Sequence, residues 1–274
     1  MLRIVTFIFI ALFSISLFAN DVAKTLEKNL LTNFEKRGLK NVDVNVSIVK
    51  KLDKVKGFYL VKVVITDKTN NKKVNQFLVS DGNLLLPDLV VINQGSSLVK
   101  ELIFMYDITN INTSNLTLIH GNRNSKNVIV KVSDFECPFC RKANEYLMEH
   151  LKNKKDVALY LIHYPLSIHK KAMLYSRILE AGLRLNKNFT SELYSGKYDN
   201  MDEKQIINTF AKMTGKELEF KKLLDSKEIN DKITQHMKIA ENYGINSTPV
   251  IFFNGRKVEG FNTQLIDKGL SLIK

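Results

Sequence analysis

Two kinds of secondary structure meet in Val128-Ile129-Val130-Lys131-Val132-Ser133-Asp134-Phe135-Glu136-Cys137-Pro138-Phe139-Cys140. The β-branched run at its start is typical of a buried strand. A helix is expected from Pro138, because proline suits the first helical turn, where its missing N–H group is not needed. The apolar residues that follow recur at steps of three and four, as on one helix face, at Cys140, Ala143, Leu147 and Leu151. The pattern predicts a strand that leads directly into a helix.

Cys137 and Cys140 are the only cysteines of the chain. A pair at this spacing, between a strand and a helix, indicates a redox-active dithiol that forms a disulfide when oxidised. The apolar face of the helix would bury Cys140, whereas Cys137 would lie at the helix N-terminus. Free backbone N–H groups and the helix dipole favour a thiolate there, and Arg141 and Lys142 add positive charge. We therefore expect Cys137 to be the nucleophile and Cys140 the resolving cysteine.

A second motif lies near the C-terminus, in Tyr243-Gly244-Ile245-Asn246-Ser247-Thr248-Pro249-Val250-Ile251-Phe252-Phe253-Asn254-Gly255. Its apolar run predicts a strand, and Asn254-Gly255 is typical of a hairpin turn. The returning strand would contain Val258, and the residues from Phe261 to Ile273 would form a closing helix.

Taken in order, these motifs resemble those of the DsbA-like thiol:disulfide oxidoreductases of the thioredoxin superfamily. Tyr164-Pro165-Leu166-Ser167-Ile168-His169 adds to the resemblance, which implies an α/β thioredoxin fold over 116–274 with a helical insertion at about 167–230. It also implies a cis-proline at Pro249, beside the cysteine pair. Substrate would be bound by residues of these two motifs, namely Thr248, Pro249, Pro138 and Phe139, with Thr248 offering backbone groups to an extended peptide.

One position departs from the family pattern. Many thioredoxin-like enzymes carry a buried acid six positions before the first cysteine, and this chain has Lys131 there. The pattern therefore does not identify the residue that accepts the Cys140 proton. Asp134 and Glu136 are the nearest acids in sequence. His169 is expected either near the active site or simply at the start of the following helix.

The residues before this domain predict a small α+β unit over 21–94 and a linker over 95–115. An amphipathic helix from Asp21 to Lys40 precedes strand patterns at 42–48, 58–65 and 74–79, and Ser80-Asp81-Gly82-Asn83 predicts a turn. The order of these elements is similar to the N-terminal dimerisation domain of the DsbC and DsbG proteins, which implies a homodimer. An unrelated extension is the alternative.

The composition and the N-terminal residues predict the class of protein and the compartment in which it acts. The chain has 274 residues, of which 45% are hydrophobic and 25% charged, as in globular proteins. Its net charge of +13 is spread along the chain without a long basic run, which favours a solvated lysine-rich surface over nucleic-acid binding. Arg3, the apolar run from Ile4 to Phe18 and the small Ala19 predict a signal peptide over 1–20, and hence a periplasmic protein.

A zinc site is the main alternative use of the cysteine pair. Structural zinc is held by four ligands, usually two cysteine pairs or two cysteines and two histidines. The chain has no second pair, and His163 and His169 flank Pro165 without the usual ligand spacing. We therefore expect neither a metal nor an organic cofactor.

The predicted function is thiol–disulfide exchange. The protein would introduce disulfides into reduced exported proteins at Cys137 and Cys140, and a DsbB-type membrane partner would reoxidise it. Two alternatives stay open, a disulfide isomerase or reductase of the DsbC/DsbG type and a holdase chaperone whose cysteines matter little.

Overall fold

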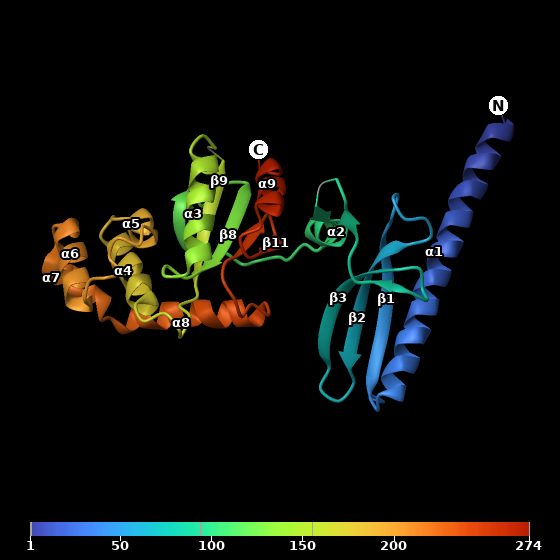
Figure 1. Ribbon diagram of the computed structural model, residues 1–274, viewed down its shortest axis with the longest axis horizontal. Helices are drawn as coiled ribbons and strands as arrows, with labels where there is room; N and C mark the ends of the chain where they lie inside the picture. The colour runs from blue at the N-terminus through green and yellow to red at the C-terminus, as the bar shows by residue number, and fades with distance from the viewer. Residues whose placement is uncertain (1, 94, 155, 274) are drawn as a thin grey trace. The chain divides into compact units, whose positions relative to one another are not determined.

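The computed structural model describes residues 2–93, 95–154 and 156–273, with side chains from Ala19 onward. The chain divides into two compact units, Met1–Asp107 and Ile108–Lys274, which are described separately (Figure 1). The predicted signal peptide falls mainly on residues 1–18, whose side chains lie outside the described residues, and it stays a prediction. None of the helices described is both long enough and apolar enough to cross a membrane.

The first unit packs helices against an antiparallel sheet. The sheet has the order β1-β2-β3-β4, and a short β5–β6 pair precedes α2. Its elements are α1 (Leu2–Lys36), β1 (Val42–Lys51), β2 (Tyr59–Asp67), β3 (Lys72–Ser80), β4 (Leu85–Leu86), β5 (Val90–Val91), β6 (Ser96–Ser97) and α2 (Leu98–Tyr106). Helix α2 lies in the segment for which the sequence predicts a linker.

Alternation along β2 gives this sheet two apolar faces. Val61 and Val63 face α1, where they pack with Leu26 and with Val44 and Val46 of β1. Leu60, which points the other way, packs with Val79 and with Val99 of α2. The predicted amphipathic helix packs on the sheet with one apolar face, which carries Val22, Leu26, Leu30 and Phe34 at steps of four residues.

The second unit is built on a sheet of order β11-β10-β8-β9-β7, in which β8 and β9 are parallel and the other pairs antiparallel. Its strands are β7 (Thr117–Gly121), β8 (Asn127–Ser133), β9 (Val157–His163), β10 (Val250–Phe253) and β11 (Arg256–Glu259). Its helices are α3 (Pro138–Leu151), α4 (Ala172–Arg184), α5 (Thr190–Tyr194), α6 (Glu203–Thr214), α7 (Glu217–Leu224), α8 (Lys227–Asn242) and α9 (Thr263–Ser271).

Helices cover both faces of this sheet. Val130 and Val132 of β8 point to one face, where they pack with Ala240 of α8 and with Ile245. Lys131 points to the opposite face and reaches α3. Because both faces are covered, β8 carries apolar residues on both sides, which explains its nearly continuous apolar sequence.

Strand pairing brings three chain segments to one edge of the sheet. Ser133, at the end of β8, lies in register with His163, at the end of the parallel β9. Val250, at the start of the antiparallel β10, lies opposite Val132. The loops that follow β8 and β9 and the loop that precedes β10 therefore meet at the same edge, where the cysteine motif lies.

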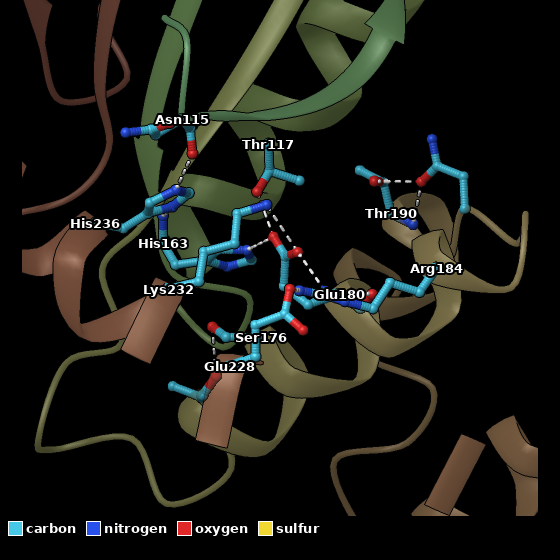
Figure 2. Close-up of polar contacts among 12 residues, drawn as sticks. Asn115, Thr117, His163, Ser176, Glu180, Arg184, Thr190, Glu228, Lys232 and His236 are labelled. Carbon is cyan, nitrogen blue, oxygen red and sulfur yellow. Dashed lines mark hydrogen bonds and ion pairs between the residues drawn. The ribbon is translucent and has the colours of Figure 1, made fainter. Parts of the chain in front are cut away.

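The helical insertion after β9 consists of α4–α8; in Figure 1 α4–α7 lie to one side of the sheet and α8 runs back below it. The sequence predicts a helical insertion at about 167–230, and the last of these helices, α8, continues beyond it to Asn242. A buried polar cluster joins the insertion to the sheet (Figure 2). Its centre is Glu180 of α4, whose carboxylate accepts hydrogen bonds from Thr117 of β7 and from Lys232 of α8, at 2.9 Å for Lys232. It also lies 3.0 Å from His163 Nε2 and pairs with Arg184.

The surroundings of Glu180 keep it ionised. Burial by itself would raise the pKa of Glu180, but the hydrogen bond and charge of His163, with Lys232 and Thr117, hold that pKa well below its usual range. The neighbouring His236 behaves differently, because burial lowers its pKa to about 3. Its ring accepts a hydrogen bond from the His163 backbone N–H and also contacts the Asn115 carbonyl. The cluster thus holds a buried carboxylate among cationic partners.

We predict that Glu180→Gln lowers the free energy of unfolding by about 3 kcal/mol at pH 7, because buried cationic partners lose their counter-charge. Glu228→Gln is the matched control, since Glu228 also pairs with Arg184 but its side chain is 77% exposed. The control should cost about 1 kcal/mol or less. Denaturant titration measures both values.

The effect of Glu180→Gln should depend on pH. A depressed pKa stabilises the folded state above the unfolded value of about 4.3, and this contribution disappears as the pH falls toward the folded pKa. The difference between the wild type and Glu180→Gln should therefore shrink below about pH 4. A difference that stays constant down to acid pH would contradict this account of the cluster.

Candidate active site

Cys137 and Cys140 lie at the start of α3. Cys137 is the N-cap residue, with φ −64° and ψ 121°, and Pro138 occupies the first helical turn. Cys137 is 6% exposed and Cys140 is fully buried. Both are free thiols. The difference in burial follows from the helix period, because Cys140 belongs to the face of α3 that packs on the sheet.

The loop before β10 lies against the first cysteine. The Thr248–Pro249 peptide bond is cis, as the resemblance implies. Cys137 Sγ lies 3.7 Å from the Thr248 carbonyl oxygen. Pro249 is buried, whereas Pro138 and Phe139 are exposed, Phe139 by 58%. The structure thus brings the predicted site residues together at one edge of the sheet.

The pKa values of the two thiols are shifted in opposite directions. The pKa of Cys137 is lowered to about 5, mainly because the Cys140 thiol donates a hydrogen bond to it. Burial opposes this shift, while the backbone N–H groups of Cys140 and Phe139 at the helix N-terminus and the side chain of Thr248 lower the pKa further. Burial raises the pKa of Cys140 strongly, and its donation to Cys137 raises it more. Cys137 is therefore a thiolate at neutral pH while Cys140 keeps its proton.

Arg141 acts differently from its predicted role as a positive charge beside Cys137. Its guanidinium forms a two-pronged pair with Asp199, at 2.6 and 2.9 Å, and its Nε donates to the Phe135 carbonyl at 2.8 Å. These contacts join α3 to the insertion, and Asp199 neutralises the charge of Arg141. The acidity of Cys137 is explained by the hydrogen bonds at the helix N-terminus.

The two nearby acids organise the loops around the site. The buried Asp134 carboxylate accepts hydrogen bonds from the backbone N–H groups of Glu136, at 2.7 Å, and Leu166, at 2.8 Å. It also lies 2.9 Å from Nδ1 of His169, which places His169 in the wall of the site. Glu136 accepts from the Lys171 backbone N–H at 2.6 Å. Both carboxylates are thus engaged by the loops rather than by the sulfur of Cys140.

A second group of residues lies beneath the cysteines. Lys131 Nζ donates to Asn144 Oδ1 at 2.7 Å and lies 4.2 Å from the centre of the Tyr194 ring. The Tyr194 hydroxyl donates to Ser133 Oγ at 2.7 Å. Asn144 follows Cys140 by four residues, so its place on the buried helix face is visible in the sequence. Tyr194 comes from the insertion, and no local pattern predicts its contact.

Comparison with known proteins identifies the family of this chain. A family model described as thioredoxin matches residues 113–267, all within the second unit. The chain belongs to the thioredoxin family. The predicted fold class is thereby confirmed, as a thioredoxin-like fold with a helical insertion that follows an N-terminal antiparallel-sheet unit.

The relatives of this thioredoxin-family chain match it in part. A probable disulfide bond formation protein D of Bacillus cereus is 27% identical over 141 residues, which cover 46% of this chain and 65% of that protein. The Na(+)/H(+) antiporter NhaA 1 of Mycolicibacterium vanbaalenii is 26% identical over 149 residues, 52% of this chain and 24% of that protein. The chain therefore spans less than two thirds of the length of either relative.

A solved structure shows the same fold. The crystal structure of the thiol-disulfide exchange protein alpha-DsbA2 from Wolbachia pipientis superposes with a TM-score of 0.50 and 14% sequence identity. The superposition covers 59% of this chain and 88% of that one.

The second unit carries a CxxC thiol:disulfide oxidoreductase site. A stabilised thiolate attacks one sulfur of a disulfide, and a nearby thiol then resolves the mixed disulfide. The acidities of Cys137 and Cys140 suit them to these two steps in that order.

We predict that the Cys137 thiolate titrates with a midpoint near pH 5. The ultraviolet absorbance of the thiolate, followed against pH in the reduced protein, measures it. Cys137→Ser is the control and should remove the transition, since the buried Cys140 keeps its proton. A midpoint at or above about 8, as in a free thiol, would contradict the described hydrogen bonding.

Proposed function

We propose that this protein is a thiol:disulfide oxidoreductase that acts as an oxidase of exported proteins. The observation that carries the proposal is the stabilised thiolate of Cys137 above a buried Cys140 thiol. Stabilising the thiolate stabilises the reduced form, and a dithiol with a stable reduced form is an oxidant. The name of the Bacillus cereus relative, a probable disulfide bond formation protein, supports the same direction.

In the proposed reaction the enzyme starts with a Cys137–Cys140 disulfide. A substrate thiolate attacks Cys137 Sγ, the enzyme disulfide breaks, and its electron pair leaves on Cys140, which takes up a proton. A second substrate thiolate then attacks the substrate sulfur of the mixed disulfide. Its electron pair leaves on Cys137, which the helix N-terminus holds as a thiolate. The substrate is oxidised by two electrons, and the enzyme is left as a dithiol.

The loop at Thr248 and Pro249 is the proposed peptide-binding edge. The Thr248 carbonyl oxygen lies 3.7 Å from Cys137 Sγ, and β10 begins beside it. An extended substrate segment would pair with this backbone and pass next to Pro138 and Phe139. Exposed apolar side chains, Phe139 at 58% and Ile168 at 78%, would suit unfolded chains.

We predict a reduction potential above about −200 mV, on the oxidising side of thioredoxin. Each unit by which the Cys137 pKa is lowered is about 1.4 kcal/mol, which for two electrons is about 30 mV. Equilibration with glutathione redox buffers measures the potential. A value near the roughly −270 mV of thioredoxin would instead indicate a reductant.

The cysteine pair itself also tests the proposal. An oxidase loses its activity on a reduced peptide in the Cys137→Ser, Cys140→Ser double variant. A holdase chaperone, the alternative from another class, would keep its effect in an aggregation assay with the same variant.

Location and partners are part of the proposal. The apolar N-terminal run after Arg3 supports export to the periplasm. There the reduced enzyme would be reoxidised by a membrane partner of the DsbB type, and its substrates would be reduced exported proteins.

The first unit is the proposed dimerisation unit, as its resemblance to DsbC and DsbG implies. It exposes large apolar residues on β3 and in the segment that follows, which favours self-association. Their exposed fractions range from 47% to 95%, at Val74, Leu84, Leu85, Val90 and Ile92. A dimer would bring two active sites into one assembly, the arrangement that would favour the isomerase alternative.

We predict that the mature protein is a dimer in light scattering and that replacing both Leu84 and Leu85 by Glu shifts it toward monomer, because charges oppose burial of this surface. Ile168→Glu is the matched control, since Ile168 is equally apolar and 78% exposed but lies in the second unit. A wild type that is monomeric at all concentrations would remove the dimer and the main argument for an isomerase.

A further inference from the structure

Lys131 is a buried amine in an apolar setting. It is fully buried in the middle of β8. Its cross-strand neighbours are Leu161 on β9 and Ile251 on β10, both fully buried as well. Among the ion pairs of the described residues, none includes Lys131. A cation without a counter-charge is costly to bury, so this lysine needs a reason beyond packing.

The amine lies against the face of α3 that carries the resolving cysteine. Asn144 follows Cys140 by four residues and therefore occupies the same face of α3, one turn further along. Lys131 Nζ donates to Asn144 Oδ1 at 2.7 Å, which holds the amine under this turn. Ser133, two residues after Lys131 on the same face of β8, also faces Cys140 and accepts from Tyr194.

The two residues that contact the amine also line a surface groove. A groove runs along α3 and α5, and its lining includes Asn144 and Tyr194, the two residues that Lys131 contacts, together with Glu145 and Ser191. Lys131 itself is fully buried, but the two residues that it contacts border this polar groove.

We propose that Lys131 is the base that accepts the proton of Cys140 when Cys140 resolves a mixed disulfide, and the acid that returns it in the reverse reaction. This inference rests on the proposed function. The neutral amine takes the Cys140 proton, and the Cys140 thiolate attacks Cys137 Sγ. The bond between Cys137 and the substrate sulfur breaks, and its electron pair leaves on the substrate as a thiolate. The enzyme disulfide forms, so the enzyme is oxidised and the substrate reduced.

Charge explains why an amine can serve where an acid is usual. A lone thiolate at Cys140 is disfavoured by burial, but proton transfer creates a thiolate–ammonium pair whose attraction offsets part of that cost. Burial lowers the pKa of Lys131 to about 7, and the charge of Cys140 raises it from an even lower value. The other titratable group packed against the amine, Tyr194, stays protonated, because burial first and then the Cys140 charge raise its pKa. Both forms of Lys131 are thus accessible near neutral pH.

The test is a single-turnover reaction of the reduced full-length protein with dithionitrobenzoate. Attack by Cys137 releases one coloured thiol, and resolution by Cys140 releases the second. In the wild type the second phase should rise with pH through a midpoint near 7 and then level off, as the neutral amine forms. In Lys131→Met it should be about a hundredfold slower at pH 7 and keep rising with pH, while the first phase stays within about threefold.

Two further variants sharpen the result. Lys212→Met, at an exposed position on α6, is the matched control and should behave as the wild type. Lys131→Glu restores a base of opposite charge and should recover most of the second-phase rate at pH 7. If Lys131→Met fails to fold, as judged by its circular-dichroism melt, Asn144→Ala replaces it, and should slow the second phase alone because the amine loses its holding contact.

The outcomes separate the two proposals. A wild type without a first phase would refute the proposed function, and this inference with it. A normal first phase with an unchanged second phase in Lys131→Met, or in Asn144→Ala where that variant replaces it, would overturn the role of Lys131 alone. Lys131→Glu no faster than Lys131→Met would also overturn it, since positive charge rather than proton acceptance would then be what Lys131 supplies.

Discussion

The antiparallel pairing of β10 with β8 is the constraint on which the active site depends. Because Val250 lies opposite Val132, the loop that begins β10 reaches the same sheet edge as the loop that ends β8. That register sets the Thr248 carbonyl against Cys137. A one-residue slip would exchange the faces of the four β10 residues, all of them apolar and buried, and would disturb the packing on both sides of the sheet, so the packing of the core and the geometry of the site are specified together.

Burial separates the functions of two chemically identical side chains. Cys137 caps the helix and receives hydrogen bonds there, whereas Cys140 lies one turn further on, inside the core. The hydrogen bond between them lowers one pKa and raises the other, since it stabilises a single negative charge on the outer sulfur. The loops held by Asp134 keep this edge in place with backbone N–H contacts rather than with free charge.

Glu180 and Lys131 are buried in the second unit in different ways. Glu180 is surrounded by cations and hydroxyl donors from the sheet and from α8, and its charge is compensated. Lys131 has an amide and an aromatic ring beside it, and its charge is only partly compensated. The first arrangement serves attachment of the insertion to the sheet. The second leaves a group whose protonation can change during a reaction.

The sequence by itself determined the elements that depend on neighbouring residues. The apolar runs of the strands, the period of three to four in α3, Pro138 at the helix start and the Asn254-Gly255 turn are local signals, and they predict β8, α3, β10 and β11. The family resemblance, which depends on both motifs, also implied that the Thr248-Pro249 loop lies beside the cysteine pair. Only the tertiary structure decided which distant side chains meet. Asp199 takes the charge of Arg141, and Tyr194 packs on Lys131. Such contacts join residues far apart in the chain, and periodicity carries no information about them, because they depend on how whole helices pack rather than on the residues next to each partner.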